Sequence, residues 1–253
     1  MFDVLIIGAG MAGLTSAIYA GRAGKKVLVL ENNVKGGEIV ESDFVANYPG
    51  VKSTSGRDLM NTVSEQAKSF GAEIKYEEVL GIEDFGDYKK VKTDENEYET
   101  KTVILAMGTE PRRLSGKQAQ DAGNRPISYC ATCDGALYAG KPVVVVGSGN
   151  TAKYVILYLE NIASKVYHIH HDDPIPSDAE AVFVAIGRVP STKFLKDFVE
   201  LDKNGYVVAG EDCKTSKSGV FVAGDCRTKE IRQLVTASSD GAVSAEMAIR
   251  YLG

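Results

Sequence analysis

Two cysteines spaced three residues apart, Cys130 and Cys133, are the side chains in this sequence best suited to covalent chemistry. A CxxC pair in an α/β protein usually serves redox exchange or zinc binding. Zinc needs four ligands, and neither Cys213 nor Cys226 stands in a second CxxC spacing, so redox chemistry is favoured over zinc and over an inert pair. One thiolate of such a pair attacks a substrate disulfide, and the other resolves the mixed disulfide. Asp134, next to the second cysteine, is suitably placed to act as an acid/base. The other two cysteines are expected to be buried small hydrophobes.

A dinucleotide-binding pattern opens the chain. Its segments are the strand 2–7, the motif GAGMAG at 8–13, a helix to about Ala23 and the strand 25–31. Gly8 permits the tight turn, Gly10 lets the backbone approach a pyrophosphate, and Gly13 lets the helix pack on the strand. The helix N-terminus favours a phosphate, and Glu31 at the end of the second strand can bind both ribose hydroxyls. This order predicts a bound dinucleotide; a plain glycine turn in an α/β core is the alternative.

The same pattern recurs at PVVVVGSGNTA, where a valine strand runs into Gly147, Gly149 and Ala152. A helix and a second strand, SKVYHIHH, follow. The position that matches Glu31 of the first copy is His170, so the second copy lacks the acid that reads a ribose.

The segment after this strand argues against a nicotinamide site. Asp172 and Asp173 would repel a 2′-phosphate, where NADPH recognition usually needs Arg or Lys. The chain enters the apolar strand AVFVAIG soon afterwards, so a sheet of only two or three strands is expected, which is too small to bury an extended dinucleotide. Pro174 and Pro176 would form a stiff connector back to the first domain. Binding of NAD through Asp172 is the alternative.

Composition and length favour a globular protein. The chain has 253 residues, of which 44% are apolar, and its net charge of −5 gives no indication of a nucleic-acid partner. No apolar run approaches the roughly 18 residues of a membrane span. The start, MFDVLIIGAG, is typical of a strand and not of a signal peptide, so a soluble cytoplasmic protein is expected. A metal site built from His168, His170 and His171 is disfavoured, because neighbouring residues of a strand alternate faces.

Taken in order, these motifs resemble those of the low-molecular-weight thioredoxin reductases, and the resemblance covers nearly the whole chain. The segments that carry it are GAGMAG, NYPG, AMG, CATCDG, GSGNTA, VFVAIGRVP, GVFVAGDC and RQLVTASSDGA. The resemblance implies an α/β fold with two dinucleotide-binding, Rossmann-like domains (FAD/NAD(P)-binding type), of which the second is truncated. It also implies FAD as the cofactor, thioredoxin as the electron acceptor and a homodimer.

The resemblance further implies roles for individual residues. Cys133 would face the flavin, Cys130 would attack the thioredoxin disulfide, and Asp134 would be the acid/base. The contacts to FAD would come from the first glycine site, the loops after it and the C-terminal part of the chain. These residues are Gly8, Gly10, Ala12, Gly13, Glu31, Gly36, Gly37, Ile39, Asn47, Val79, Ala106, Gly108, Gly224, Asp225, Arg232, Gln233 and Ala237.

The segment HIHHDDP departs from the NADPH-dependent members, which carry a basic HRRxxxR-type segment here. In this respect the chain resembles the pyridine-nucleotide-independent branch, the ferredoxin-linked flavin thioredoxin reductases. That resemblance implies that reduced ferredoxin delivers single electrons to FAD, which then reduces the Cys130–Cys133 disulfide. Two alternatives stay open: an NAD(P)H-dependent thioredoxin reductase with a shortened site, and a flavin-binding redox sensor or scaffold without turnover.

We predict a discontinuous FAD-binding domain, 1–112 with 190–253, and a truncated pyridine-nucleotide-like domain, 113–189, that carries the CxxC pair. Two or three meander strands are expected within 75–105, and a helix over 242–252. An acidic ferredoxin would need a basic docking patch. The candidates around the junctions with the truncated domain are Arg112, Arg113, Lys117, Lys141 and Arg188.

Overall fold

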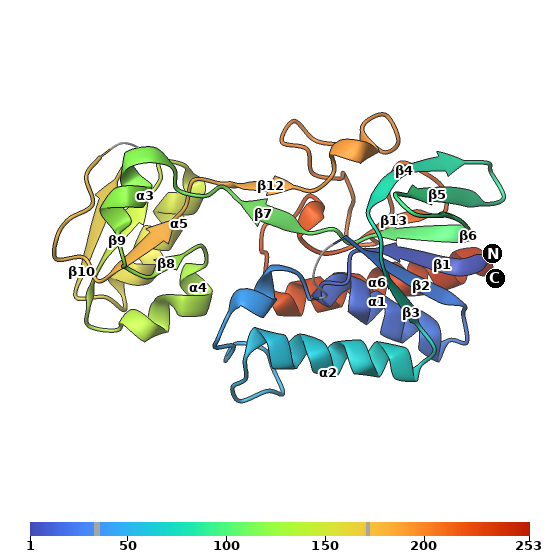
Figure 1. Cartoon of the computed structure of the whole chain (residues 1–253), viewed down its shortest axis with the longest axis horizontal. Helices are drawn as coiled ribbons and strands as arrows, with labels where there is room; N and C mark the ends of the chain where they lie inside the picture. The colour runs from blue at the N-terminus through green and yellow to red at the C-terminus, as the bar shows by residue number, and fades with distance from the viewer. Residues whose placement is uncertain (33–35, 171–172) are drawn as a thin grey trace. The chain divides into compact units, whose positions relative to one another are not determined.

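The computed structural model describes residues 1–32, 36–170 and 173–253. The chain forms two compact units, which we call the first unit (Met1–Glu110 with Pro190–Gly253) and the second unit (Pro111–Val189). The two crossings between them are made by β7 (Thr109–Pro111) and β12 (Arg188–Pro190), which pair as a two-stranded ribbon (Figure 1). Within the described ranges, none of the helices has both the length and the apolar character needed to cross a bilayer.

A seven-stranded sheet forms the centre of the first unit. Its strands are β1 (Phe2–Ile7), β2 (Val27–Glu31), β3 (Glu73–Tyr76), β4 (Val79–Asp84), β5 (Lys89–Thr93), β6 (Glu97–Leu105) and β13 (Val220–Val222). The order is β3-β2-β1-β6-β5-β4, with β13 also paired to β6. Strands β3, β2, β1, β6 and β13 are parallel, whereas β4, β5 and β6 form the predicted antiparallel meander. The central strands are buried on both faces, which explains their unbroken apolar sequences.

Helices α1 (Met11–Arg22), α2 (Gly56–Ser69) and α6 (Leu234–Leu252) lie together along one side of this sheet (Figure 1). Short helices η1 (Gly37–Glu41), η3 (Lys193–Leu195) and η4 (Gly224–Cys226) lie in the loops. α1 and α6 approach so closely that a Cβ on Gly241 would lie 2.4 Å from the carbonyl oxygen of Ala12. The close approach places the amino-terminal glycine motif beside the C-terminal part of the chain.

The second unit has a parallel sheet of four strands, in the order β10-β9-β11-β8. Its elements are α3 (Gly116–Ala122), β8 (Ile127–Ser128), α4 (Ala131–Asp134), η2 (Gly135–Tyr138), β9 (Pro142–Val146), α5 (Asn150–Glu160), β10 (Lys165–Ile169) and β11 (Ala181–Val184). The expectation of two or three strands was wrong, because the short strand β8 pairs with β11 and adds a fourth.

The connection after β10 also differs from the prediction. The segment with Pro174 and Pro176 does not return to the first unit; it leads into β11, inside the sheet of the second unit. Two side chains hold this short connection. Gln118 Nε2 donates to the carbonyl of His170 (2.7 Å), and Arg125 Nε donates to the carbonyl of Ala179 (2.8 Å). These two side chains supply hydrogen-bond donors to backbone carbonyls at the two ends of the short connection.

Candidate functional site

The glycine motif of the first unit forms the turn between β1 and α1. Gly8 has φ +105°, and a Cβ there would lie 2.4 Å from the carbonyl oxygen of Ala106. A Cβ on Gly13 would lie 1.9 Å from the carbonyl oxygen of Gly8, so this position also excludes a side chain. At Gly10, by contrast, a Cβ would meet no heavy atom within 4 Å. The motif therefore leaves open space at the amino end of α1, where helical N–H groups lack partners within the helix.

Glu31 faces this turn from the end of β2. Its Oε2 accepts a hydrogen bond from the backbone N–H of Ala9 at 2.8 Å, and the residue is 9% exposed. The loop after β2 returns to the same place, because the N–H of Gly36 donates to the carbonyl of Ala9 at 2.8 Å. A Cβ on Gly37 would lie 3.8 Å from Cα of Gly10. Glu31 at the end of β2 and two glycines of the following loop, Gly36 and Gly37, thus gather around Gly10 at the amino end of α1.

Residues far along the chain join this turn from the C-terminal part. A Cβ on Gly224 in η4 would lie 2.9 Å from Cβ of Ala12 and 3.9 Å from Cβ of Ala237. Asn47 Nδ2 donates to Gln233 Oε1 at 3.3 Å. The structure therefore brings together these predicted residues from opposite ends of the sequence.

The remaining predicted residues are more dispersed. Arg232 Nε donates to the backbone carbonyl of Asp225 at 3.3 Å. Gly108 follows β6 with φ +68°. Ile39 and Val79 pack against hydrophobic clusters on opposite faces of the sheet, so the structure does not bring these two side chains together.

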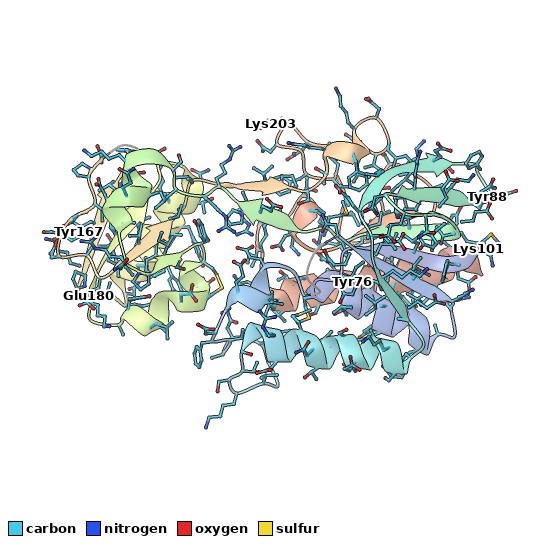
Figure 2. All side chains as sticks on the ribbon, viewed as in Figure 1. Tyr76, Tyr88, Lys101, Tyr167, Glu180 and Lys203 are labelled. Carbon is cyan, nitrogen blue, oxygen red and sulfur yellow. A yellow bond between two sulfur atoms is a disulfide. The ribbon has the colours of Figure 1, made fainter. Side chains whose placement is uncertain are left out.

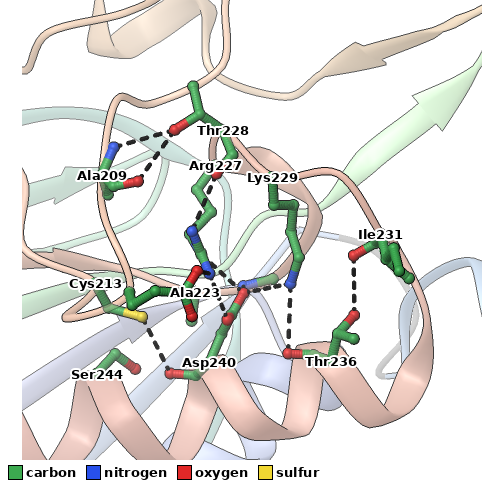
Figure 3. A network of polar contacts seen from close by, with 12 residues as sticks. Ala209, Cys213, Ala223, Arg227, Thr228, Lys229, Ile231, Thr236, Asp240 and Ser244 are labelled. Atoms are coloured by element: carbon green, nitrogen blue, oxygen red, sulfur yellow. Dashed lines mark hydrogen bonds and ion pairs between the residues drawn. The ribbon is translucent and has the colours of Figure 1, made fainter.

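A buried ionic network fixes the position of η4 (Figure 3). Asp240 on α6 accepts from Arg227 Nε (3.0 Å) and Lys229 Nζ (2.6 Å), and its Oδ2 also accepts from the N–H of Gly224 (3.0 Å). Burial alone would raise the pKa of Asp240, but hydrogen bonds from Arg227 and Lys229 outweigh burial and hold that pKa below its ordinary value. The motif RQLVTASSDGA contains Asp240, but the sequence alone gives no reason to single it out.

These residues fit a flavin dinucleotide. Glycines leave the space that a pyrophosphate needs at a helix amino end, a carboxylate stands at the end of the second strand, and a glycine turn from the C-terminal part reaches Ala12. The residues that would hold FAD are the predicted ones around Gly10, Glu31 and Gly224.

The second glycine motif repeats the backbone of the first. A Cβ on Gly147 would lie 2.4 Å from the carbonyl oxygen of Ala185, the same distance as between Gly8 and Ala106. The N–H of Gly8 donates to Leu30, and the N–H of Gly147 donates to Ile169. The residue that follows Ile169 is His170, which confirms that an exposed histidine occupies the position equivalent to Glu31.

His168 lies in strand β10, two residues before His170. His168 Nε2 lies 2.7 Å from the carbonyl oxygen of Gly147, which gives this imidazole a hydrogen-bond partner within the protein. His171 and Asp172 lie outside the described residues.

The CxxC pair occupies a single helical turn between β8 and β9. Cys130 and Cys133 form a disulfide with a Cα–Cα distance of 5.3 Å, and both residues are half-buried (Figure 2). The N–H groups of Cys133 and Asp134 both donate to the carbonyl of Cys130 at 3.1 Å, which winds the turn. Ser128 Oγ donates to Asp134 Oδ2 at 2.6 Å, a contact that the sequence did not indicate.

The basic residues predicted for ferredoxin docking do not form one patch. Lys141 precedes β9 and pairs with Glu180, labelled in Figure 2, at the amino ends of β9 and β11 (3.3 Å). The N–H of Arg112 instead donates to the carbonyl of Gly187, beyond the carboxyl end of β11, and Arg188 follows directly. The inclusion of Lys141 was therefore wrong, because parallel strands place it at the opposite end of the sheet.

Comparison with known proteins identifies relatives along the whole chain. The family model for pyridine nucleotide-disulphide oxidoreductases matches residues 2–178 and 173–241. A thioredoxin reductase from Bacillus subtilis is 33% identical over 300 residues, covering 100% of this chain and 95% of the relative.

Solved structures give the same result. Thioredoxin reductase from Streptococcus pyogenes superposes with a TM-score of 0.92 at 32% identity, covering 100% of this chain and 98% of the other. A ferredoxin-flavin thioredoxin reductase from Clostridium acetobutylicum superposes with a TM-score of 0.63 at 28% identity, covering 99% of this chain and 97% of the other. These structures confirm the two-domain α/β fold expected from the sequence.

Both sequence matches are interrupted. The family match consists of two separate segments, which overlap at residues 173–178, just after β10. The alignment with the Bacillus subtilis protein runs over 300 residues, although this chain has 253, so it contains positions that this chain lacks.

Proposed function

Because this chain belongs to the pyridine nucleotide-disulphide oxidoreductases and, within them, to the thioredoxin reductases, we propose that it reduces thioredoxin with electrons from reduced ferredoxin instead of NADPH. The chain is a flavoprotein disulfide reductase, and FAD is its cofactor. The proposal concerns the electron donor and the roles of individual residues. A homodimer and a cytoplasmic location remain predictions from the sequence.

One observation supports the choice of donor: the described part of the second unit keeps the CxxC turn, but the residue at the position of Glu31 is not an acid. His170 stands where Glu31 stands in the first unit. The chain passes from β10 to β11 through a short connection, and the family match is interrupted there. A solved relative is named a ferredoxin-flavin thioredoxin reductase, so a ferredoxin donor has a precedent in this fold.

The cysteine turn accounts for disulfide exchange. FAD, when bound, can accept electrons singly and deliver them in pairs. Two electrons and two protons convert the Cys130–Cys133 disulfide into a dithiol. The Asp134 carboxylate takes the proton of the Cys130 thiol, and the resulting Cys130 thiolate attacks the thioredoxin disulfide. This attack forms a mixed disulfide and releases one thioredoxin thiolate, which takes that proton back from Asp134. Cys133 attacks the sulfur of Cys130, restores the disulfide and releases the second thioredoxin thiol.

Anaerobic stopped-flow spectroscopy of the FAD-loaded protein tests the donor. We expect the flavin absorption band to bleach rapidly with reduced ferredoxin and to persist with NADPH or NADH. Rapid bleaching by either nicotinamide would contradict the proposal. The matched control is Cys130→Ser, which should still accept electrons from ferredoxin but lose thioredoxin reduction, because it lacks the attacking thiol.

Two other functions remain as alternatives. The glycine turn at Gly147 is intact, which favours an NAD(P)H-dependent thioredoxin reductase with a shortened site; the same stopped-flow experiment distinguishes it. A flavin-binding sensor without turnover has no need for the cysteine pair, and a wild-type protein whose flavin is reduced but which does not reduce thioredoxin would favour it.

A further inference from the structure

Ser128 is a buried side chain that contacts both ends of the redox turn. It is 6% exposed, and its Oγ lies 2.6 Å from Asp134 Oδ2. The same Oγ accepts a hydrogen bond from the N–H of Cys130 at 3.1 Å and lies 3.3 Å from the carbonyl oxygen of Cys130. Strand β8 holds Ser128 in register with Phe183 of β11, so its position is set by the sheet and not by the redox turn.

The hydroxyl of Ser128 has one hydrogen and two acceptors within reach. While Asp134 is ionised, the nearer carboxylate oxygen takes that hydrogen, since hydrogen bonds to a charged acceptor are stronger. When Asp134 carries a proton, its carboxyl O–H can donate to Ser128 Oγ, and the serine hydrogen can turn to the carbonyl of Cys130. A carboxyl group that gains and loses a proton thus keeps the same partner in both states.

Other side chains near the redox turn can be named from their contacts. Across the described ranges, the hydrogen bond to the Asp134 side chain comes from Ser128. Burial and the negative charge of Asp134 raise the pKa of Tyr138 in the following short helix, so that phenol stays protonated at neutral pH. Helix α5 presents Tyr158 and Leu159 toward Gly135, the residue after Asp134. These contacts place Tyr138 and Tyr158 beside the redox turn, and Lys141 Nζ lies 5.9 Å from the ring centroid of Tyr138.

We propose that Ser128 is a positioning residue that holds Asp134 in place through both charge states of the acid/base cycle. The proposal rests on the proposed function, in which Asp134 transfers a proton during disulfide exchange. Without the hydroxyl group, the carboxylate loses the hydrogen bond that orients it.

The test uses the half-reaction that needs no external electron donor. FAD-loaded full-length protein is reduced with excess dithiol, freed of reductant under anaerobic conditions and mixed with oxidised thioredoxin. Thioredoxin fluorescence then gives the rate of disulfide exchange as a function of pH. The variants are Ser128→Ala, Ser128→Thr, Asp134→Asn and the double variant Ser128→Ala/Asp134→Asn. Ser164→Ala, at an exposed serine between α5 and β10, is the matched control.

We expect Ser128→Ala to slow exchange about tenfold or more, the factor associated with a hydrogen bond to a charged group. Its pH–rate profile should differ from that of the wild type, because the acid/base group has lost the partner that orients it. Ser128→Thr should restore both rate and profile, since threonine keeps the hydroxyl group. In the Asp134→Asn background, Ser128→Ala should have little further effect.

Three results would overturn the proposal, and they differ in what else they affect. If Ser128→Ala keeps the wild-type rate and pH–rate profile while Asp134→Asn is slow, Ser128 has no positioning role. The acid/base assignment of Asp134 is then unaffected. Equal slowing by Ser128→Ala in both backgrounds shows a general structural effect. A wild-type rate for Asp134→Asn removes the acid/base assignment, and with it the role of Ser128, but leaves the question of the electron donor open to the stopped-flow experiment.

Discussion

At the scale of single residues, burial separates Cys213 and Cys226 from the redox pair. Both lie fully buried in the first unit. Burial, with the charge of Asp240 as a second cause, raises the pKa of the Cys213 thiol to about 12. Burial also raises the pKa of Cys226 to about 11. Since the thiolate is the reactive form, neither should take part in exchange at neutral pH.

This difference predicts the outcome of a thiol titration with a disulfide reagent at neutral pH. The oxidised native protein should react at no cysteine, and the dithiol form should react at two, Cys130 and Cys133. The unfolded control should expose Cys213 and Cys226 as well. Rapid reaction of the oxidised native protein would show that one of the buried thiols is accessible.

At the scale of elements, Asp240 connects helix α6 to the turn η4 that carries Gly224. Its folded-state pKa is below the ordinary value, so the ionised carboxylate stabilises the folded protein at neutral pH. That contribution should begin to decrease as the pH falls below about 4, the ordinary pKa of an aspartate. It should be lost once the pH has fallen through the lower pKa that Asp240 has in the folded protein.

We therefore expect Asp240→Asn to be less stable at neutral pH by about 3 kcal/mol, because two buried cations lose their charged partner. The difference from wild type should shrink as the pH falls, and urea unfolding monitored over an acid pH series measures it. The matched control is Glu246→Gln, an exposed acid on the same helix that pairs with Arg250. A stability difference that stays constant with pH would contradict the assignment.

At the scale of the whole molecule, two units with separate hydrophobic clusters should not unfold as one two-state system. The predicted FAD residues all lie in the first unit, so added FAD should raise the unfolding transition of that unit alone. FAD at a concentration of about a hundred times its dissociation constant should add about 2.7 kcal/mol to the free energy of unfolding of the unit that binds it.

Calorimetry of the flavin-free protein with and without FAD measures this effect, and a fluorescent label attached to Cys130 and Cys133 after reduction reports on the second unit. Riboflavin is the control, because it lacks the pyrophosphate that should bind at the amino end of α1. Equal stabilisation of both transitions would mean that FAD contacts are not confined to the first unit.

Local sequence was enough to place the motifs on their elements. The runs FDVLII and PVVVV become β1 and β9, and each glycine motif begins the following helix. These assignments succeed because a strand buried on both faces needs an unbroken apolar run, and the turn after it needs glycine. The strand count of the second unit was not predictable in this way, because β8 has two residues and no periodic pattern.

The sequence by itself determined the family, the FAD cofactor and the presence of a vicinal cysteine pair, because glycine turns, strand ends and the CxxC spacing are properties of contiguous segments. Only the tertiary structure decided which polar groups meet. Asp240 reaches Gly224 across 16 positions, and Ser128, which β8 holds in register with β11, reaches Asp134 across 6 positions. A buried hydroxyl or carboxylate must find a partner, and the path of the chain, not the local sequence, determines which partner lies within hydrogen-bond distance.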